Sequence, residues 1–189
     1  MLNDAYAVNP NLVSCFYSAS SMWAANAATF SPSMDNIDNA IHITVANLNS
    51  MMHRSIEPKF TYKMLKRILN KKVNINKSLL NLPNIGDEGA ANHIRIAERH
   101  NAPGYQIFVY SSENISHAKT IGRQSLIGSK LIARKNCVED QRVFYLQQSN
   151  KAIRYGSFHN DIVTTANENI FIYHEEAFES TQELKVILA

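Results

Sequence analysis

The sequence predicts an α+β fold in which N-terminal helices precede a mostly antiparallel β-sheet. The 189 residues, 45% hydrophobic and 19% charged, suit one compact domain with a real core. Apolar residues recur at helical spacing in the first half and at period two in the second. The glycine-rich phosphate loops of nucleotide-binding βαβ folds do not occur in the sequence. We therefore expect a single domain over 1–189, with a helical half over about 1–104 and a sheet half over about 105–189.

Four helices are predicted in the helical half. An Ala- and Ser-rich helix is expected over 15–30, and a second over about 35–52, where apolar residues share one face. A third helix is expected over about 60–70, with lysines and Arg67 facing solvent, and a fourth over 87–100. The residues expected to face inward on the third helix are Phe60, Met64, Leu65, Ile68 and Leu69.

Six strands are predicted in the sheet half, where the composition becomes rich in β-branched and aromatic residues. Ser180 and Glu183 then have the spacing of a helix capping box, which predicts a short last helix or the tail of one more strand. No internal repeat is visible in the sequence. The six strands are Tyr105–Tyr110, Ala118–Gly122, Lys130–Arg134, Arg142–Gln147, Ala152–Phe158 and Ile170–Tyr173.

Composition excludes several classes of protein. The sequence holds no apolar run of the length needed for a transmembrane helix, and its start lacks the pattern of a secretory signal peptide. A net charge of +3 argues against a dedicated nucleic-acid binder. The default localisation is therefore cytoplasmic, with delivery by a specialised secretion system left open. The abundant asparagine is attributed to AT-rich coding.

Metal and cofactor sites are not predicted. The two cysteines are too few for a disulfide scaffold or a thiolate zinc site. The seven histidines show none of the spacings at which a helix presents two zinc ligands. We therefore expect no metal and no cofactor.

Cys15 is the first candidate for chemistry. It stands at the predicted start of a helix, where the helix dipole and free backbone N–H groups favour a nucleophilic thiolate. A cysteine on an Ala-rich helix is also commonly a small buried apolar residue, so both interpretations stay open. Downstream, His117 begins a predicted strand and Asn136 ends the next, so the Asn136 side chain could orient the imidazole of His117.

These segments resemble the papain-like cysteine peptidases, and in particular the secreted bacterial effector proteases of that superfamily. The segment around Cys15, the His117-Ala118 pair and the strand end at Lys135-Asn136 carry the resemblance. It implies a papain-like fold in which Cys15 is the nucleophile, His117 the general base and acid, and Asn136 the orienting group. The side chain of Asn9 or Asn11 could share the oxyanion site with the backbone N–H of Cys15.

The resemblance implies a thiol protease, deamidase or acyl transferase that acts on a protein substrate in another cell, as a bacterial effector, toxin or virulence factor. It does not indicate the oligomeric state. The sequence departs from the family pattern, because no glycine precedes Cys15 and Cys137 stands where Ser-Trp is usual after Asn136. His159, with Glu175 at the end of a later strand, is an alternative base and carboxylate pair.

Two other functions are considered. Glu168 ahead of the apolar strand Ile170–Tyr173 resembles the last catalytic strand of ADP-ribosyltransferase toxins, although residues 1–12 lack the expected cofactor-binding Arg or His. The uninterrupted basic residues from Lys59 to Lys77 could instead make a non-enzymatic module that binds nucleic acid or an anionic surface. A solvated helix face explains the same residues, so a nucleic-acid partner is not favoured.

Overall fold

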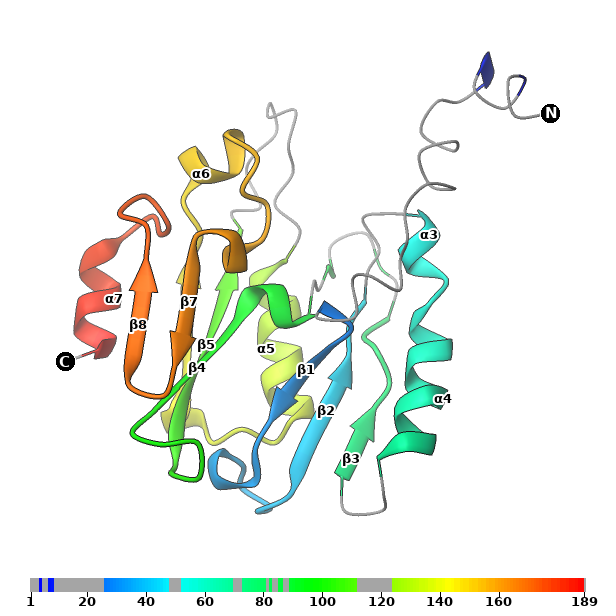
Figure 1. Ribbon diagram of the computed structural model, residues 1–189, viewed down its shortest axis with the longest axis horizontal. Coiled ribbons are helices and arrows are strands. Elements are labelled where there is room, and N and C mark those ends of the chain that lie inside the picture. Colours follow the sequence, from blue (N-terminus) through cyan, green and yellow to red (C-terminus); the bar gives the residue numbers. More distant parts are fainter. Residues whose placement is uncertain are drawn as a thin grey trace.

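The structure, a computed structural model, describes residues 4, 7–8, 26–47, 52–69, 73–80, 82, 85–86, 89–111 and 124–188, the side chains of residues 52 and 53 excepted. In this part of the chain, two three-stranded sheets and one two-stranded sheet are accompanied by helices (Figure 1). No helix of the described residues is long and apolar enough to span a bilayer.

The first sheet has the order β1-β2-β3. Strand β1 (Ala28–Ser31) pairs antiparallel with β2 (Ile41–Val45), and β2 pairs parallel with β3 (Val73–Asn76). A parallel pair requires a long crossover, and here the crossover contains α3 (Met52–Ser55) and α4 (Pro58–Ile68).

The second sheet repeats this plan with the order β4-β5-β6. Strand β4 (His93–Ala97) is antiparallel to β5 (Gly104–Tyr110), which is parallel to β6 (Val143–Gln147). Helix α5 (Leu126–Lys135) lies in the crossover. Strand, strand, helix and strand therefore follow one another twice, a structural repeat that the sequence does not reveal.

A third unit begins with the antiparallel pair β7 (Thr164–Asn167) and β8 (Ile170–Tyr173), followed by α7 (Thr181–Leu188). It reproduces the first three elements of the plan. Two short 3-10 turns lie within units, η2 (Ser33–Asp35) and η4 (Asp140–Arg142). The short elements between the units are the 3-10 turns η3 (Gly89–Asn92) and η5 (Asn160–Ile162) and the helix α6 (Asn150–Arg154).

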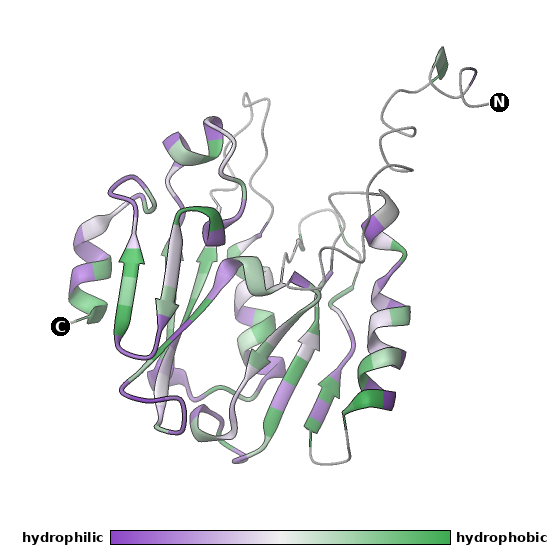
Figure 2. Ribbon diagram, viewed as in Figure 1, coloured by the Kyte–Doolittle hydropathy of each residue, from purple (hydrophilic) through white to green (hydrophobic). Residues whose placement is uncertain are grey.

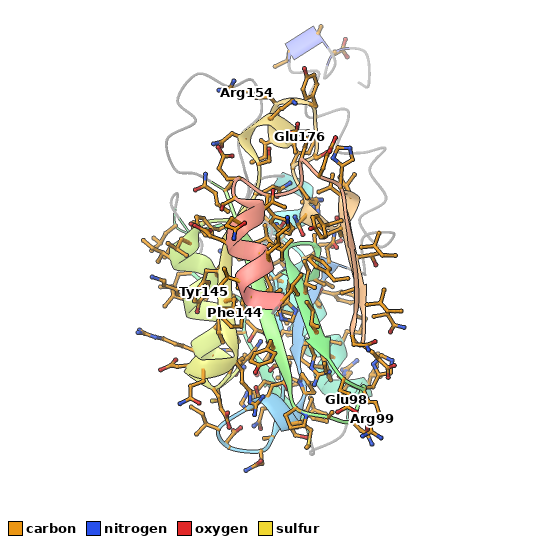
Figure 3. The ribbon with its side chains drawn as sticks, turned by 90° about the vertical axis from the view of Figure 1, so that its left-hand side faces the viewer. Glu98, Arg99, Phe144, Tyr145, Arg154 and Glu176 are labelled. Atoms are coloured by element: carbon orange, nitrogen blue, oxygen red, sulfur yellow. The ribbon has the colours of Figure 1, made fainter. Side chains whose placement is uncertain are left out.

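The second sheet has a hydrophobic core on each face, because neighbouring residues of a strand point to opposite sides. Phe144 packs with Ile107, Leu146 and Leu184 against α7 and the β7-β8 pair. Its neighbour Tyr145 packs instead with Phe108 and Ile132 against α5 (Figure 3 labels both residues on β6). Helix α5 also contacts β2, so it lies between the two three-stranded sheets.

A buried polar network joins the two sheets where η2 meets β4 and β5. The Asp35 carboxylate is fully buried and accepts hydrogen bonds from Arg95 Nε at 2.6 Å and Nη2 at 3.0 Å. It also accepts from the backbone N–H of Gly104 at 2.7 Å and from Gln106 Nε2 at 3.2 Å. The buried charge is therefore paired and fully surrounded by donors, as burial of an ion requires.

Both ends of α5 are fixed by local hydrogen bonds. The Ser125 side chain caps the start by accepting from the backbone N–H of Gly128 at 3.0 Å. After the cap residue Asn136 the chain turns back at Cys137, which has φ 53°, and the N–H of Val138 donates to the Ala133 carbonyl at 3.1 Å. This is the usual helix stop with a left-handed residue, where glycine is the ordinary occupant.

The structure corrects several predicted elements. The helix expected over 35–52 is wrong, because this segment forms η2 and strand β2. The helix expected over 87–100 is also wrong, because η3 and strand β4 occupy it. The strand expected at Lys130–Arg134 belongs to helix α5. The helical half therefore contains strands, and each three-stranded sheet mixes parallel and antiparallel pairs.

The third predicted helix is confirmed as α4, but its predicted buried face is wrong. Phe60 is 69% exposed and Ile68 is 68% exposed, and Leu65 is only half-buried. Figure 2 shows hydrophobic and hydrophilic residues alternating along α4 on the outer side of the first sheet. The helix contacts β2 and β3 over a narrow stripe, and Thr61 is its buried residue.

The predicted strands Tyr105–Tyr110, Arg142–Gln147 and Ile170–Tyr173 are confirmed in β5, β6 and β8. The last helix is confirmed as α7, and the Ser180 side chain accepts from the N–H of Glu183 at 3.3 Å. The strand at Ala152–Phe158 is wrong, since α6 covers its start.

Two predicted elements cannot be compared in full. Of the helix expected over 15–30, residues 28–30 belong to strand β1 and residues 15–25 lie outside the described residues. The strand expected at Ala118–Gly122 also lies outside them.

Candidate active site

Most of the residues predicted to carry cysteine chemistry lie outside the described part of the chain. These are Cys15, His117 and the two oxyanion candidates, Asn9 and Asn11. The structure therefore gives no distance between Cys15 and an imidazole.

Asn136 has a structural position in the part of the chain that is described. It is fully buried at the end of α5, and its Oδ1 accepts a hydrogen bond from Thr44 Oγ1 at 2.6 Å. Next to it, the Lys135 carbonyl accepts from Asn76 Nδ2 at 2.9 Å. These bonds fasten α5 to the first sheet, which accounts for the burial of Asn136 without a role in orienting a histidine.

His159, the alternative base, is 7% exposed and directly precedes η5. Burial raises the pKa of the nearby Asp161 carboxyl, and the charge of His159 acts on that pKa in the opposite direction. Glu175, the carboxylate predicted to accompany His159, is exposed in the turn after β8. Asp161 is thus an acidic group close enough to His159 to be affected by its charge, and the sequence analysis did not select it.

The turn that carries His159 is fixed by hydrogen bonds between its backbone and the side chains of Asn92 and Thr164. The backbone N–H of Asn160 donates to Asn92 Oδ1 at 2.9 Å, which joins η5 to η3. Thr164 Oγ1 donates to the Asn160 carbonyl at 3.0 Å and closes the turn onto β7. Asn92 is 2% exposed and Asn160 is fully buried. His159 therefore stands on a rigid support.

The turn η3 also packs closely against the first sheet, through Gly89. Gly89 has φ +61°, and a Cβ there would overlap the carbonyl oxygen of Asn26 and lie 2.9 Å from Ala46 Cβ. Glycine is required at this position by its backbone angle and by the close approach. The ends of β1 and β2 therefore meet η3, and through η3 they meet η5.

We call the buried polar residues at this junction the Asn–His cluster. They come from three different units of the fold, and Figure 1 shows the turn ahead of β7 at the upper ends of the sheets. Convergent buried polar groups on loops held by a rigid scaffold are typical of ligand and active sites. The members are Asn26, Asn92, His159, Asn160 and Thr164.

A second group of reactive side chains lies at the opposite end of the sheets. Asp38 and His42 come from the β1-β2 connection and β2, and Cys137 follows α5; Figure 1 shows both segments at the lower end. His42 Nε2 lies 2.9 Å from Asp38 Oδ2, and this hydrogen bond lowers the pKa of the Asp38 carboxyl. Burial raises the pKa of the Cys137 thiol, and the charge of Asp38 raises it further. Because this group and the Asn–His cluster lie at opposite ends of the sheets (Figure 1), Cys137 is remote from the cluster.

Comparisons with known proteins give the family. The family model for succinylarginine dihydrolase matches residues 1–189. The N-succinylarginine dihydrolase of Cronobacter sakazakii is 40% identical over 194 residues, covering 100% of this chain and 44% of the relative. That of Shewanella amazonensis is 41% identical over 189 residues, covering 96% of this chain and 43% of the relative. The chain spans less than half the length of these relatives.

These matches overturn the interpretation as a papain-like effector. The resemblance to cysteine peptidases is wrong, and so are the functions drawn from it: a thiol protease, toxin or virulence factor acting on a protein substrate. The predicted delivery into another cell by a specialised system is wrong for the same reason. The two alternative functions, an ADP-ribosyltransferase toxin and a basic interaction module, are wrong as well. What remains of that prediction is a relationship to hydrolases. This chain belongs to the succinylarginine dihydrolase family.

Proposed function

We propose that this chain takes part in the hydrolysis of N-succinylarginine and supplies a proton-transfer group of the active site. The matched relatives carry that activity in their names, and the similarity extends over the whole of this chain. Because the chain spans 44% of one relative and 43% of the other, the proposal concerns its own contribution to the reaction.

Hydrolysis at a guanidinium carbon sets clear chemical demands. Water or another nucleophile adds to the carbon, and a C–N bond then breaks with release of ammonia. The leaving nitrogen needs a proton, and the attacking water must lose one, so a group that can both accept and donate a proton accelerates the reaction. A carboxylate that forms paired hydrogen bonds with the guanidinium would hold it in place.

His159 and Asp161 match these demands among the described residues. Histidine is the side chain whose ordinary pKa allows it to exchange protons near neutral pH. Asp161 supplies an exposed carboxyl within the range of the His159 charge, so it could face a cationic guanidinium while His159 transfers the proton. The observation that carries the proposal is the burial of His159 on a turn that Asn92 holds by a 2.9 Å hydrogen bond.

Ammonia release from N-succinylarginine by the purified chain tests the proposal. We expect His159→Ala to lower the rate by about 10²–10⁴-fold, the usual contribution of a general acid–base. Added imidazole should restore part of the lost rate, because a free base can occupy the space that the substitution opens. His100→Ala is the matched control, since the His100 side chain is 77% exposed and distant from the cluster in the fold.

The proposal also predicts binding that can be measured without turnover. Calorimetric titration should show saturable binding of N-succinylarginine to the wild-type chain and weaker binding to Asp161→Asn. A chain that neither binds N-succinylarginine nor releases ammonia from it would refute the proposal. Equal rates for wild type and His159→Ala would refute the role of His159.

A further inference from the structure

Asp38, His42 and Cys137 place three different metal-binding side chains in one small space. A carboxylate oxygen, an imidazole nitrogen and the thiol sulfur all lie within 4.8 Å of one another. The residues come from the loop after η2, from β2 and from the turn after α5, so the fold brings them together from distant parts of the sequence. We propose that they form a binding site for a zinc-class transition-metal ion.

The chemistry of the three donors indicates the class of ion. Thiolate and imidazole are ligands that zinc and the neighbouring first-row metals prefer, whereas magnesium and calcium prefer sites made of oxygen alone. Three protein ligands and a water complete a tetrahedral zinc site. In such a site the donor atoms lie about 3.3–3.6 Å apart, so small rotations of Asp38 and Cys137 around the fixed His42 would close the site.

The backbone around the site is already rigid. The N–H of Ile37 donates to the Cys137 carbonyl at 2.8 Å, and the N–H of Glu139 donates to the Asp35 carbonyl at 3.0 Å. Asn36 and Val138 form an antiparallel bridge between the same two segments. The two halves of the site are therefore fastened together without a metal, so metal binding requires little ordering of the chain.

His42 has features that a purely packing histidine would not need. It is 5% exposed, its Nε2 faces the Asp38 carboxylate, and among the described residues its buried Nδ1 has no hydrogen-bond partner. A buried polar atom without a partner costs free energy, and such atoms call for an explanation. A metal bound through Nδ1 would give that atom a partner, whereas a metal bound through Nε2 would replace the contacts of that nitrogen with Asp38 Oδ2 and with Asn74 Nδ2.

Cys137 also occupies an unfavourable backbone position. Its φ of 53° is the left-handed conformation that the end of α5 requires, and glycine or asparagine would adopt it with less strain. The hydrogen-bonded turn that ends α5 fixes the backbone of Cys137, and so limits the directions in which its thiol can point. No spacing motif announces the site, because Cys137 is far from the other two ligands in the sequence.

Cobalt(II) is the probe that tests the site, because a bound thiolate gives it a charge-transfer band in the near ultraviolet. The tag-free chain is treated with a chelator and titrated with cobalt(II), and then with zinc in competition. We expect one cobalt ion per chain with the thiolate band, and displacement of the cobalt by zinc. Cys15→Ser is the matched control for the second cysteine and should keep the band.

Cys137→Gly is the decisive variant, because it removes the thiol and suits the backbone, so folding is retained. It should abolish the thiolate band and weaken zinc binding by at least about tenfold. His42→Asn should weaken zinc binding similarly, with circular dichroism confirming the fold. Absence of the band in wild type, or an unchanged band in Cys137→Gly, would overturn the proposal. Ammonia release from N-succinylarginine should not change in Cys137→Gly, so this test and that of the proposed function fail separately.

Discussion

Asp35 and Arg95, 60 residues apart in the sequence, form a buried two-point ion pair with Nε 2.6 Å from one carboxylate oxygen and Nη2 3.0 Å from the other. The pair links the first structural unit to the second. Because Gly104 and Gln106 also donate to Asp35, removal of the carboxylate would take an acceptor away from two buried donors. The Arg95 guanidinium would lose its counter-charge and keep its hydrogen bond to the Ala102 carbonyl.

We expect Asp35→Ala to lower the free energy of unfolding by about 3–5 kcal/mol, the usual cost of breaking a buried ion pair on one side. Urea denaturation measures it. The control is Glu176→Ala, which breaks an ion pair of the same 2.6 Å length with Lys151 on exposed side chains. Figure 3 shows Glu176 at the end of the molecule that carries α6. This control should cost less than about 1 kcal/mol, and equal losses would contradict the role of burial.

His93 should make stability depend on pH. Burial lowers its pKa to about 4, against an ordinary value of 6.5, while its hydrogen bond to Gln106 acts in the opposite direction. The unfolded chain therefore binds more protons between these values, and stability is fully present above pH 6.5 and is lost as the pH falls towards 4. The loss is at most about 3 kcal/mol.

Unfolding measured across this pH range in wild type and His93→Gln isolates the effect. The variant should show a flatter dependence, whereas His100→Gln, on an exposed histidine, should keep the wild-type slope. If the slopes of wild type and His93→Gln coincide, His93 does not carry the effect.

Substitution of Gly89 and of Gly156 by alanine should separate the cost of backbone strain at positive φ from the cost of a steric clash. Both have positive φ, but a Cβ at Gly89 would overlap the Asn26 carbonyl, while a Cβ at Gly156 would have nothing within 4 Å. Gly156→Ala should cost about 1 kcal/mol from backbone strain alone, and Gly89→Ala more than about 3 kcal/mol. Thermal unfolding of the two variants checks this order. A smaller loss for Gly89→Ala would contradict the close packing of η3 on the first sheet.

Cys137→Gly should stabilise the metal-free protein. Glycine relieves the left-handed strain at φ 53° but increases the freedom of the unfolded chain, so the net gain is about 0.5 kcal/mol. Asn39→Gly is the control, because asparagine tolerates φ 54° well and should gain less. Denaturant titrations in the presence of a chelator measure both. A loss of stability in Cys137→Gly would show that the thiol makes packing contacts that outweigh the strain.

The predictable elements were those with unambiguous local signals. Tyr105–Tyr110 is a continuous run of strand-forming residues and became β5, the central strand of the second sheet. Ser180 with Glu183 predicted the start of α7 through a hydrogen bond between neighbours. Both signals act within a few residues of the chain, so no knowledge of distant contacts was needed.

The segment over 35–52 shows why other elements were missed. Ile37, Ile41 and Val45 have helical spacing, but Ile41, Ile43 and Val45 also alternate as in a strand. The β-branched residues favour the strand, and pairing with β1 and β3 decides it. Lys130–Arg134 is the reverse case, because its short run of consecutive apolar residues suits a buried strand as well as the helix that Ser125 caps.

The candidate site was only partly predictable. His159 was selected as an alternative base from its local sequence, but its acidic neighbour was taken to be Glu175 rather than Asp161. Asn92 could not be found, because its hydrogen bond joins units 68 residues apart. The abundant asparagine had been attributed to coding, yet Asn92, Asn136 and Asn160 are buried and hold turns together.

The direct test of the account is the NMR signal of the His159 imidazole during titration with N-succinylarginine. If the Asn–His cluster forms part of the substrate site, the His159 ring signal shifts and saturates as ligand is added, while the signal of exposed His100 stays in place. A His159 signal that does not respond at saturating N-succinylarginine would contradict the assignment of this cluster to the reaction.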